Sequence, residues 1–124
     1  MTTKEYKEWE KEAIERGYRK YNTTSSTNDY SYFKTIGKSD GRYKYMIEWR
    51  VWDFNKYADR DPTLKKSPFS IEVNIIPDSI KSDMRLDMLI GDPLVFGFDK
   101  IEVIAENYHK FLIAEGITER IEKE

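Results

Sequence analysis

Apolar residues recur at helical spacing near both ends of the chain and alternate with polar ones through its middle. Near the N-terminus this spacing predicts a helix over residues 2–21. Its apolar face is formed by Tyr6, Trp9, Ala13, Ile14, Gly17 and Tyr21. Thr2 and Glu5 have the spacing of a capping box, in which each side chain accepts a hydrogen bond from the other residue's backbone N–H. Gly17 is a candidate for ending this helix early, because glycine commonly follows a helix C-cap.

A second helical pattern begins near residue 99. Asp99 and Glu102 again have capping-box spacing, which predicts Asp99 as the N-cap. The apolar positions that follow form a narrow stripe of Ile101, Ile104, Ala105, Tyr108, Phe111 and Leu112. Gly116 is expected to end the helix, which makes residues 116–124 either a last turn or a frayed tail.

Between the helices, the chain contains four strand candidates, at residues 30–36, 43–54, 69–76 and 84–90. The first two are separated by "GKSDG" at 37–41, a strong hairpin signal. Period-two alternation is typical of an antiparallel sheet with one covered face and one face in water. In the third strand it places Ile71, Val73 and Ile75 inside and Ser70, Glu72 and Asn74 outside.

Length and element order together predict the fold. A chain of 124 residues is one domain by the usual size of domains. The order predicts an α+β domain over 1–124, with a four-stranded antiparallel meander and the N- and C-terminal helices on one face of the sheet. The residues predicted to form its core are Trp9, Tyr45, Ile47, Trp49, Val73, Leu86, Met88, Ile104, Tyr108 and Phe111.

The strand at 43–54 raises the main functional question, because the face that it turns away from the core carries both charged and apolar residues. Alternation puts Trp49 inward and therefore turns Trp52 and Arg50 outward. This outer face could carry cross-strand ion pairs in water, could be covered by a second layer, or could recognise a partner through Trp and Arg, which are enriched at binding hot spots. The candidate binding residues are Met46, Arg50, Trp52, Phe54, Glu72 and Arg85.

Several chemistries are disfavoured. The chain has no cysteine, which removes disulfides, thiol catalysis and cysteine metal sites. The only histidine, His109, lies at the edge of the second helical stripe, which indicates a solvated or edge-packed side chain. "GKS" at 37–39 is no P-loop, because the first glycine of that motif would fall at Tyr32. The carboxylates at 59–61 are typical of a solvated loop. We therefore predict no catalytic residues, no metal and no cofactor, although carboxylate pairs leave an enzyme as a minor alternative.

The net charge and the length of the apolar runs restrict which classes of partner the chain is expected to bind. Twenty-one Lys and Arg against twenty-three Asp and Glu give a net charge of −2, which disfavours nucleic acid. The N-terminus carries no signal-peptide pattern, and no apolar run is long enough for a membrane span, so we expect a cytoplasmic protein.

The resulting prediction is a small protein-interaction module without catalytic activity. Its partner is another protein or a second copy of itself, bound on the outer sheet face. The alternative is a small-molecule or nucleotide binder that uses the aromatic residues near Trp52 and the loop at 55–68. A compact, motif-free, acidic domain is also typical of accessory proteins of phages and mobile elements, an association that carries no mechanism.

Overall fold

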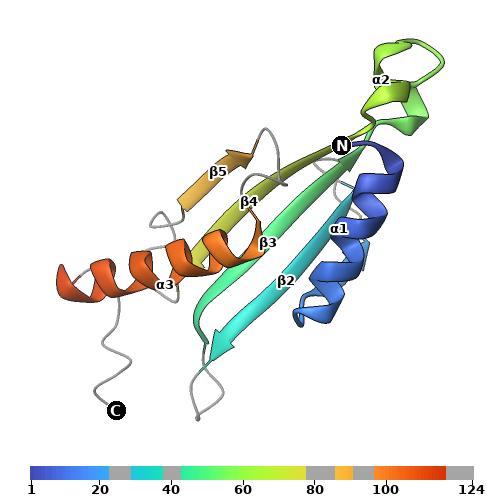
Figure 1. The fold of residues 1–124 in the computed structure, drawn as a ribbon. Helices are drawn as coiled ribbons and strands as arrows, with labels where there is room; N and C mark the ends of the chain where they lie inside the picture. The colour runs from blue at the N-terminus through green and yellow to red at the C-terminus, as the bar shows by residue number, and fades with distance from the viewer. Residues whose placement is uncertain (23–28, 38–42, 78–85, 91–96, 117–124) are drawn as a thin grey trace.

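The computed structural model describes residues 1–22, 29–37, 43–77, 86–90 and 97–116 (Figure 1). Its elements are α1 (Thr3–Glu15), β1 (Arg19–Asn22), β2 (Tyr30–Gly37), β3 (Tyr43–Asp53), the 3₁₀ helix η1 (Asn55–Tyr57), α2 (Thr63–Lys66), β4 (Phe69–Pro77), β5 (Leu86–Ile90) and α3 (Phe98–Ala114). The strands form one antiparallel sheet in the order β1-β2-β3-β4-β5. Both α1 and α3 lie on one face of it (Figure 1). The predicted α+β class and meander are confirmed.

The N-terminal helix is shorter than predicted. It ends at Glu15, and Gly17 follows the C-cap residue with a φ of +93°. A left-handed φ favours glycine, which has no Cβ to clash with its own backbone. The early end at Gly17 is thus confirmed, whereas the helix predicted to reach residue 21 was wrong. Residues 19–22 pair with β2 instead and add a fifth strand at the edge of the sheet.

The two capping predictions had different outcomes. At α1 the box is present: Thr2 N donates to Glu5 Oε1 at 2.8 Å, and Glu5 N donates to Thr2 Oγ1 at 3.1 Å. At α3 the prediction was wrong, because the N-cap is Gly97 and Asp99 lies inside the first turn. Glu102 does not turn back to the helix start, since its carboxylate accepts hydrogen bonds from other elements. The predicted end at Gly116 is confirmed by its φ of +69° after the C-cap.

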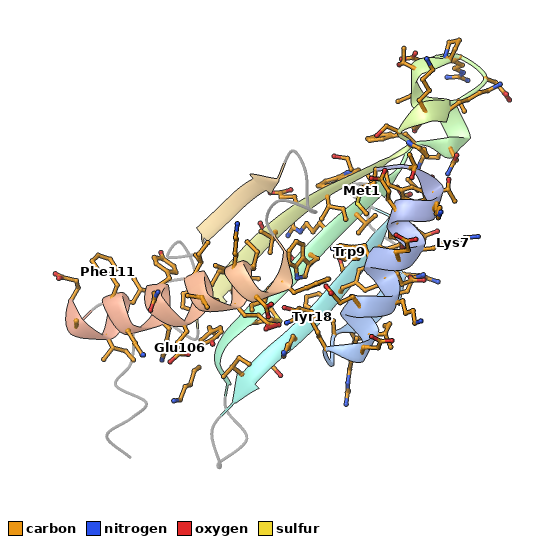
Figure 2. All side chains as sticks on the ribbon, viewed as in Figure 1. Met1, Lys7, Trp9, Tyr18, Glu106 and Phe111 are labelled. Carbon is orange, nitrogen blue, oxygen red and sulfur yellow. The ribbon has the colours of Figure 1, made fainter. Side chains whose placement is uncertain are left out.

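The core lies between the two helices and the sheet. Trp49 of β3 is fully buried, and its ring centroid lies 5.5 Å from that of Trp9 in α1 and 5.0 Å from that of Phe98 in α3. Figure 2 shows Trp9 directed towards the sheet and Lys7 directed away from it. The predicted core residues that are buried are Trp9, Tyr45, Ile47, Trp49 and Val73. One tryptophan therefore joins both helices to the sheet.

The buried face of α3 differs from the predicted stripe. Ile104 and Tyr108 are only half-buried, and Phe111 is 54% exposed, so its assignment to the core was wrong. His109, expected in water or at the edge, is 2% exposed and lies with its ring centroid 5.5 Å from that of Tyr45. The face that α3 does bury consists of Phe98, Ile101, Ala105, His109 and Leu112.

Carboxylates on one side of α3 explain why the helix is rotated about its axis relative to the predicted stripe. Tyr45 Oη donates to Glu106 Oε2 at 2.9 Å. Tyr18 Oη and Lys34 Nζ both contact Glu102 Oε1 at 3.2 Å. These contacts hold the Glu102 and Glu106 side of α3 towards the core and leave Phe111 outside. The predicted hairpin is confirmed by the antiparallel pairing of β2 with β3, whereas residues 38–41 of its loop and the side chains of Leu86 and Met88 lie outside the described residues.

Candidate functional site on the outer face of the sheet

The outer face is the face of the sheet opposite α1 and α3. Because Trp49 points towards the helices, its neighbours on β3 alternate to this face. The register of β3 and β4 then sets four cross-strand pairs, Met46 with Ile76, Glu48 with Asn74, Arg50 with Glu72 and Trp52 with Ser70. Four of the six predicted binding residues, Met46, Arg50, Trp52 and Glu72, thus share one surface.

A carboxylate is buried at the centre of this face. Glu48 is 6% exposed, and its Oε1 accepts hydrogen bonds from Arg50 Nε at 2.9 Å and from Asn74 Nδ2 at 3.1 Å. Burying a charge is costly unless it is paired and hydrogen-bonded, and these two donors meet that need. Asn74 was predicted to be exposed and is 0% exposed, so the centre of the outer face is not a wet surface.

The Asn74 amide has a single possible orientation. If it were turned over, its Oδ1 would face the Glu48 carboxylate, and two acceptors would meet. With Nδ2 on Glu48, Oδ1 is buried and has no hydrogen-bond partner in the described part of the chain. Asn74 is therefore placed to hold Glu48, at the expense of one unsatisfied acceptor.

Arg50 makes no cross-strand ion pair with the residues that the structure describes. Glu72 lies opposite it in the register, yet within the described ranges Arg50 pairs with Glu48 and no ion pair involves Glu72. The Arg50 side chain is 26% exposed, and its contact with Glu48 uses only Nε. A guanidinium carries five N–H donors in a planar fork that matches a carboxylate. Both terminal nitrogens of Arg50 are therefore placed to receive an acidic group.

The remaining candidates lie elsewhere. Phe54 follows the end of β3 as the N-cap of η1, and its ring centroid lies 6.4 Å from that of Tyr57. It lies one residue beyond the last pair of β3 and β4, Asp53 with Phe69, so the strand alternation does not extend to its side chain. Arg85 lies outside the described residues.

A hollow of about 460 Å³, here called the β1 hollow, lies at the β1 edge of the sheet. It is lined by Gly17, Arg19, Tyr21, Phe33, Lys34 and Thr35. The rings of Tyr21 and Phe33 meet edge to face with centroids 5.2 Å apart. Phe33 pairs with Glu48 across β2 and β3, so the β1 hollow and the buried carboxylate share the outer face. Arg19 has no ion pair with any residue that the structure describes.

The sequence analysis missed Arg19 and Tyr21 because it assigned both to the first helix. The signal that could have found them is Gly17. If the helix is taken to end there, Arg19 and Tyr21 alternate on one side of a short strand. Whether Arg19 and Tyr21 are assigned to a helix or to a strand thus depends on the residue at which the first helix is taken to end.

A second polar cluster lies at the junction of α1, β1 and β2. The Glu10 carboxylate accepts hydrogen bonds from Tyr32 Oη and Tyr6 Oη, these two hydroxyls contact each other, and Lys20 Nζ lies 2.7 Å from Glu10 Oε2. Burial raises the pKa of both tyrosines, so they stay protonated as donors. Burial alone would raise the pKa of Glu10, but the hydrogen bonds from Lys20 and Tyr32 lower it overall. This closed network satisfies its own groups and is structural.

Comparison with protein-family models, with curated proteins and with solved structures finds no match to this chain. Among the described residues, no three His, Asp or Glu side chains are grouped so that they could hold a metal ion. The helices in the described ranges include none that is both long and apolar enough to cross a membrane.

Proposed function

We propose that this chain is a non-catalytic protein-interaction module that binds an acidic segment of another protein on its outer sheet face. The observation that carries the proposal is Arg50. Glu48 holds its Nε, which orients the guanidinium, while no described residue pairs with the terminal nitrogens of this half-buried side chain. A pre-oriented arginine loses less side-chain freedom on binding than one extended into water.

The surroundings of Arg50 support the same partner. Arg19 lies on β1, two strand spacings or about 10 Å from β3, and adds a second positive charge on this face. Tyr21, Phe33 and Trp52 supply aromatic surface near the two arginines. Arginine and large aromatic residues are the types that dominate binding energy at protein interfaces. A second copy is less well supported as the occupant, because a two-fold axis here would bring arginines of like charge together.

Binding of synthetic peptides tests the proposal. We expect acidic peptides to bind more tightly than neutral or basic peptides of equal length in fluorescence polarisation, with affinity falling as salt is added. Arg19→Ala should weaken binding about tenfold, the equivalent of about 1.4 kcal/mol. Arg50→Ala should do the same but also leaves Glu48 with one donor fewer, so its fold must be checked by circular dichroism. Lys7→Ala, on the far side of α1, is the control and should bind as the wild type does.

The proposal fails if peptides of all three charges bind alike or not at all. It also fails if either Arg19→Ala or a folded Arg50→Ala variant binds acidic peptides at wild-type strength. Because Lys7 lies on the side of α1 away from the sheet, loss of binding in the Lys7→Ala control would place the contact on another surface.

The β1 hollow favours a second function, binding of a small anionic ligand with an aromatic ring, such as a nucleotide. Its volume falls within the usual range for ligand sites, and it offers Arg19 with an aromatic pair. None of the β1 hollow, the hollow beside Val103 and the one beside Lys110 is lined by Trp52 or by the loop at 55–68, and the β1 hollow carries this alternative better. A nucleotide that raises the melting temperature of the wild type but not of Arg19→Ala would favour it.

A further inference from the structure

The outward side of α3 carries residues at the spacing of a helix-pairing seam. Intervals of four and three residues alternate along Lys100, Ile104, Asn107, Phe111 and Ala114. This is the 3.5-residue repeat by which two helices stay in contact along their length. Phe111, with more than half its surface exposed, projects from α3 (Figure 2). Apart from Ile104, which is half-buried and packs against the core, the seam lies away from the face that α3 buries against the sheet.

The same side of the helix also carries a shallow apolar hollow. This hollow, here called the α3 hollow, has a volume of about 370 Å³ and is bordered by Asp99, Lys100, Val103 and Ile104. Val103 is 60% exposed and gives the rim an apolar surface. Phe111 lies seven residues beyond Ile104, about two helical turns or 10 Å along the axis. One helix therefore presents both an exposed aromatic side chain and an apolar depression.

We propose that two copies of this chain associate through antiparallel α3 helices, with Phe111 of each copy in the α3 hollow of the other. Ile104 and Phe111 lie almost equally far on either side of Asn107, so a two-fold axis near Asn107 places Phe111 of each copy against Ile104 of the other. Such an interface is self-complementary, as a two-fold dimer requires. The two Asn107 amides meet at the axis, where they can hydrogen-bond to each other and fix the register.

The charges along the seam favour this antiparallel direction. Lys100 near the start of α3 and Glu115 just after its end are both exposed. Antiparallel pairing brings Lys100 of each copy towards Glu115 of the other. Parallel pairing would instead place lysine beside lysine and glutamate beside glutamate, which is unfavourable. The order of charges is therefore complementary to itself only when the helices run in opposite directions.

The seam is short, which sets the expected strength. From Lys100 to Ala114 it spans about 21 Å at the α-helical rise. A single helix pair of that length falls in the small class of interfaces, which are weak or transient. We therefore expect a dimer that forms with rising concentration and leaves the outer sheet face uncovered. This inference goes beyond the proposed function and does not depend on it.

Sedimentation of the full chain over a concentration series is the first test. The average mass should rise from that of one chain, 14.8 kDa, towards twice that value. Phe111→Ala should stay monomeric with an unchanged circular dichroism spectrum, because Phe111 contributes little to the core. Ile14→Ala removes a comparably exposed side chain from α1 and should associate as the wild type does. A wild type that stays monomeric at all concentrations, or a Phe111→Ala variant that dimerises normally, overturns the proposal.

The absence of cysteine allows a direct test of the register. Asn107→Cys places one thiol per chain at the proposed axis, and mild oxidation should link two copies through a disulfide. Lys7→Cys, on the side of α1 away from the sheet, is the matched control and should stay mostly unlinked. Glu115→Lys alone should weaken the dimer, and adding Lys100→Glu should restore it. Equal cross-linking of both cysteine variants, or a charge exchange that restores nothing, contradicts the antiparallel pairing.

Discussion

At the scale of single residues, Trp49 determines how the layers meet. Its ring contacts Trp9 from one helix and Phe98 from the other, so it fills the place where three elements converge. Aromatic side chains bury more surface than any others and pack best with offset or edge-on neighbours. The position of α3 relative to α1 therefore depends on this one side chain.

Trp49→Ala should lower the free energy of unfolding by about 3–5 kcal/mol, because it leaves a large cavity between both helices and the sheet. Urea denaturation followed by circular dichroism measures this loss. A loss below about 1 kcal/mol would show that Trp49 is not the centre of the core.

Glu10 should make stability depend on pH. Its pKa is lowered in the folded chain, so the carboxylate form contributes stability that is present above the ordinary glutamate pKa of about 4.3. This contribution is lost as the pH falls through the lower folded pKa. Glu10→Gln should therefore cost about 1–3 kcal/mol at pH 7 and less at pH 3. Melting temperatures at the two pH values test this, and an equal loss at both would contradict it.

At the scale of elements, β1 depends on the turn at Gly17. The left-handed φ of this residue ends α1 and directs the chain into the strand that lines the β1 hollow. For a residue with a Cβ, that conformation is about 1–2 kcal/mol less favourable. The backbone angle at one position thus determines whether residues 19–22 continue the helix or form an edge strand.

Gly17→Ala should therefore lower the free energy of unfolding by about 1–2 kcal/mol, although the space around a new Cβ is open. Gly97→Ala is the matched control, since a Cβ there also meets no atom within 4 Å and its φ is −66°. Chemical denaturation of both variants should show a larger loss at Gly17. Equal losses would indicate that the left-handed conformation is not the cause.

The sequence predicted elements better than it predicted their rotation and their ends. Alternation placed Trp49 and Ile47 correctly, because the period of a strand admits only two faces. A helix has no such restriction, and α3 turned towards its carboxylates, which buried His109 and exposed Phe111. That rotation depends on Tyr45, which is distant in sequence and cannot be read from the apolar stripe. The sequence placed Met46, Arg50, Trp52 and Glu72 on the outer face, as the structure does. It did not predict that Arg50 pairs with Glu48.

At the scale of the whole molecule, Glu102 connects the helices to the sheet. Its carboxylate contacts Arg16 Nη1 at 3.3 Å, and also Tyr18 and Lys34, so it joins α3 to the end of α1 and to β2. Arg16 additionally reaches Asp99 at 2.8 Å. These contacts join segments that are far apart in the chain, in a region between the two helices.

Glu102→Ala should lower the free energy of unfolding by about 1–3 kcal/mol, because it removes one acceptor that serves several donors. Glu12→Ala is the control, since Glu12 is exposed and its pair with Arg16 is 3.8 Å long. Such surface pairs contribute about 0–1 kcal/mol. Thermal unfolding of the two variants should separate them, and similar melting temperatures would show that Glu102 does not hold the layers together.

The sequence-ordered meander has a consequence for how the chain folds. Every strand pairs with its neighbour in sequence, so the sheet can form from local contacts, which is typical of rapid folding. The contact of Trp9 with Phe98 is different, because it joins the two ends of the chain. During synthesis, the sheet and α1 can therefore assemble before α3 leaves the ribosome. Until α3 docks, Phe98 does not cover Trp49, so this part of the core is completed only by contacts from α3.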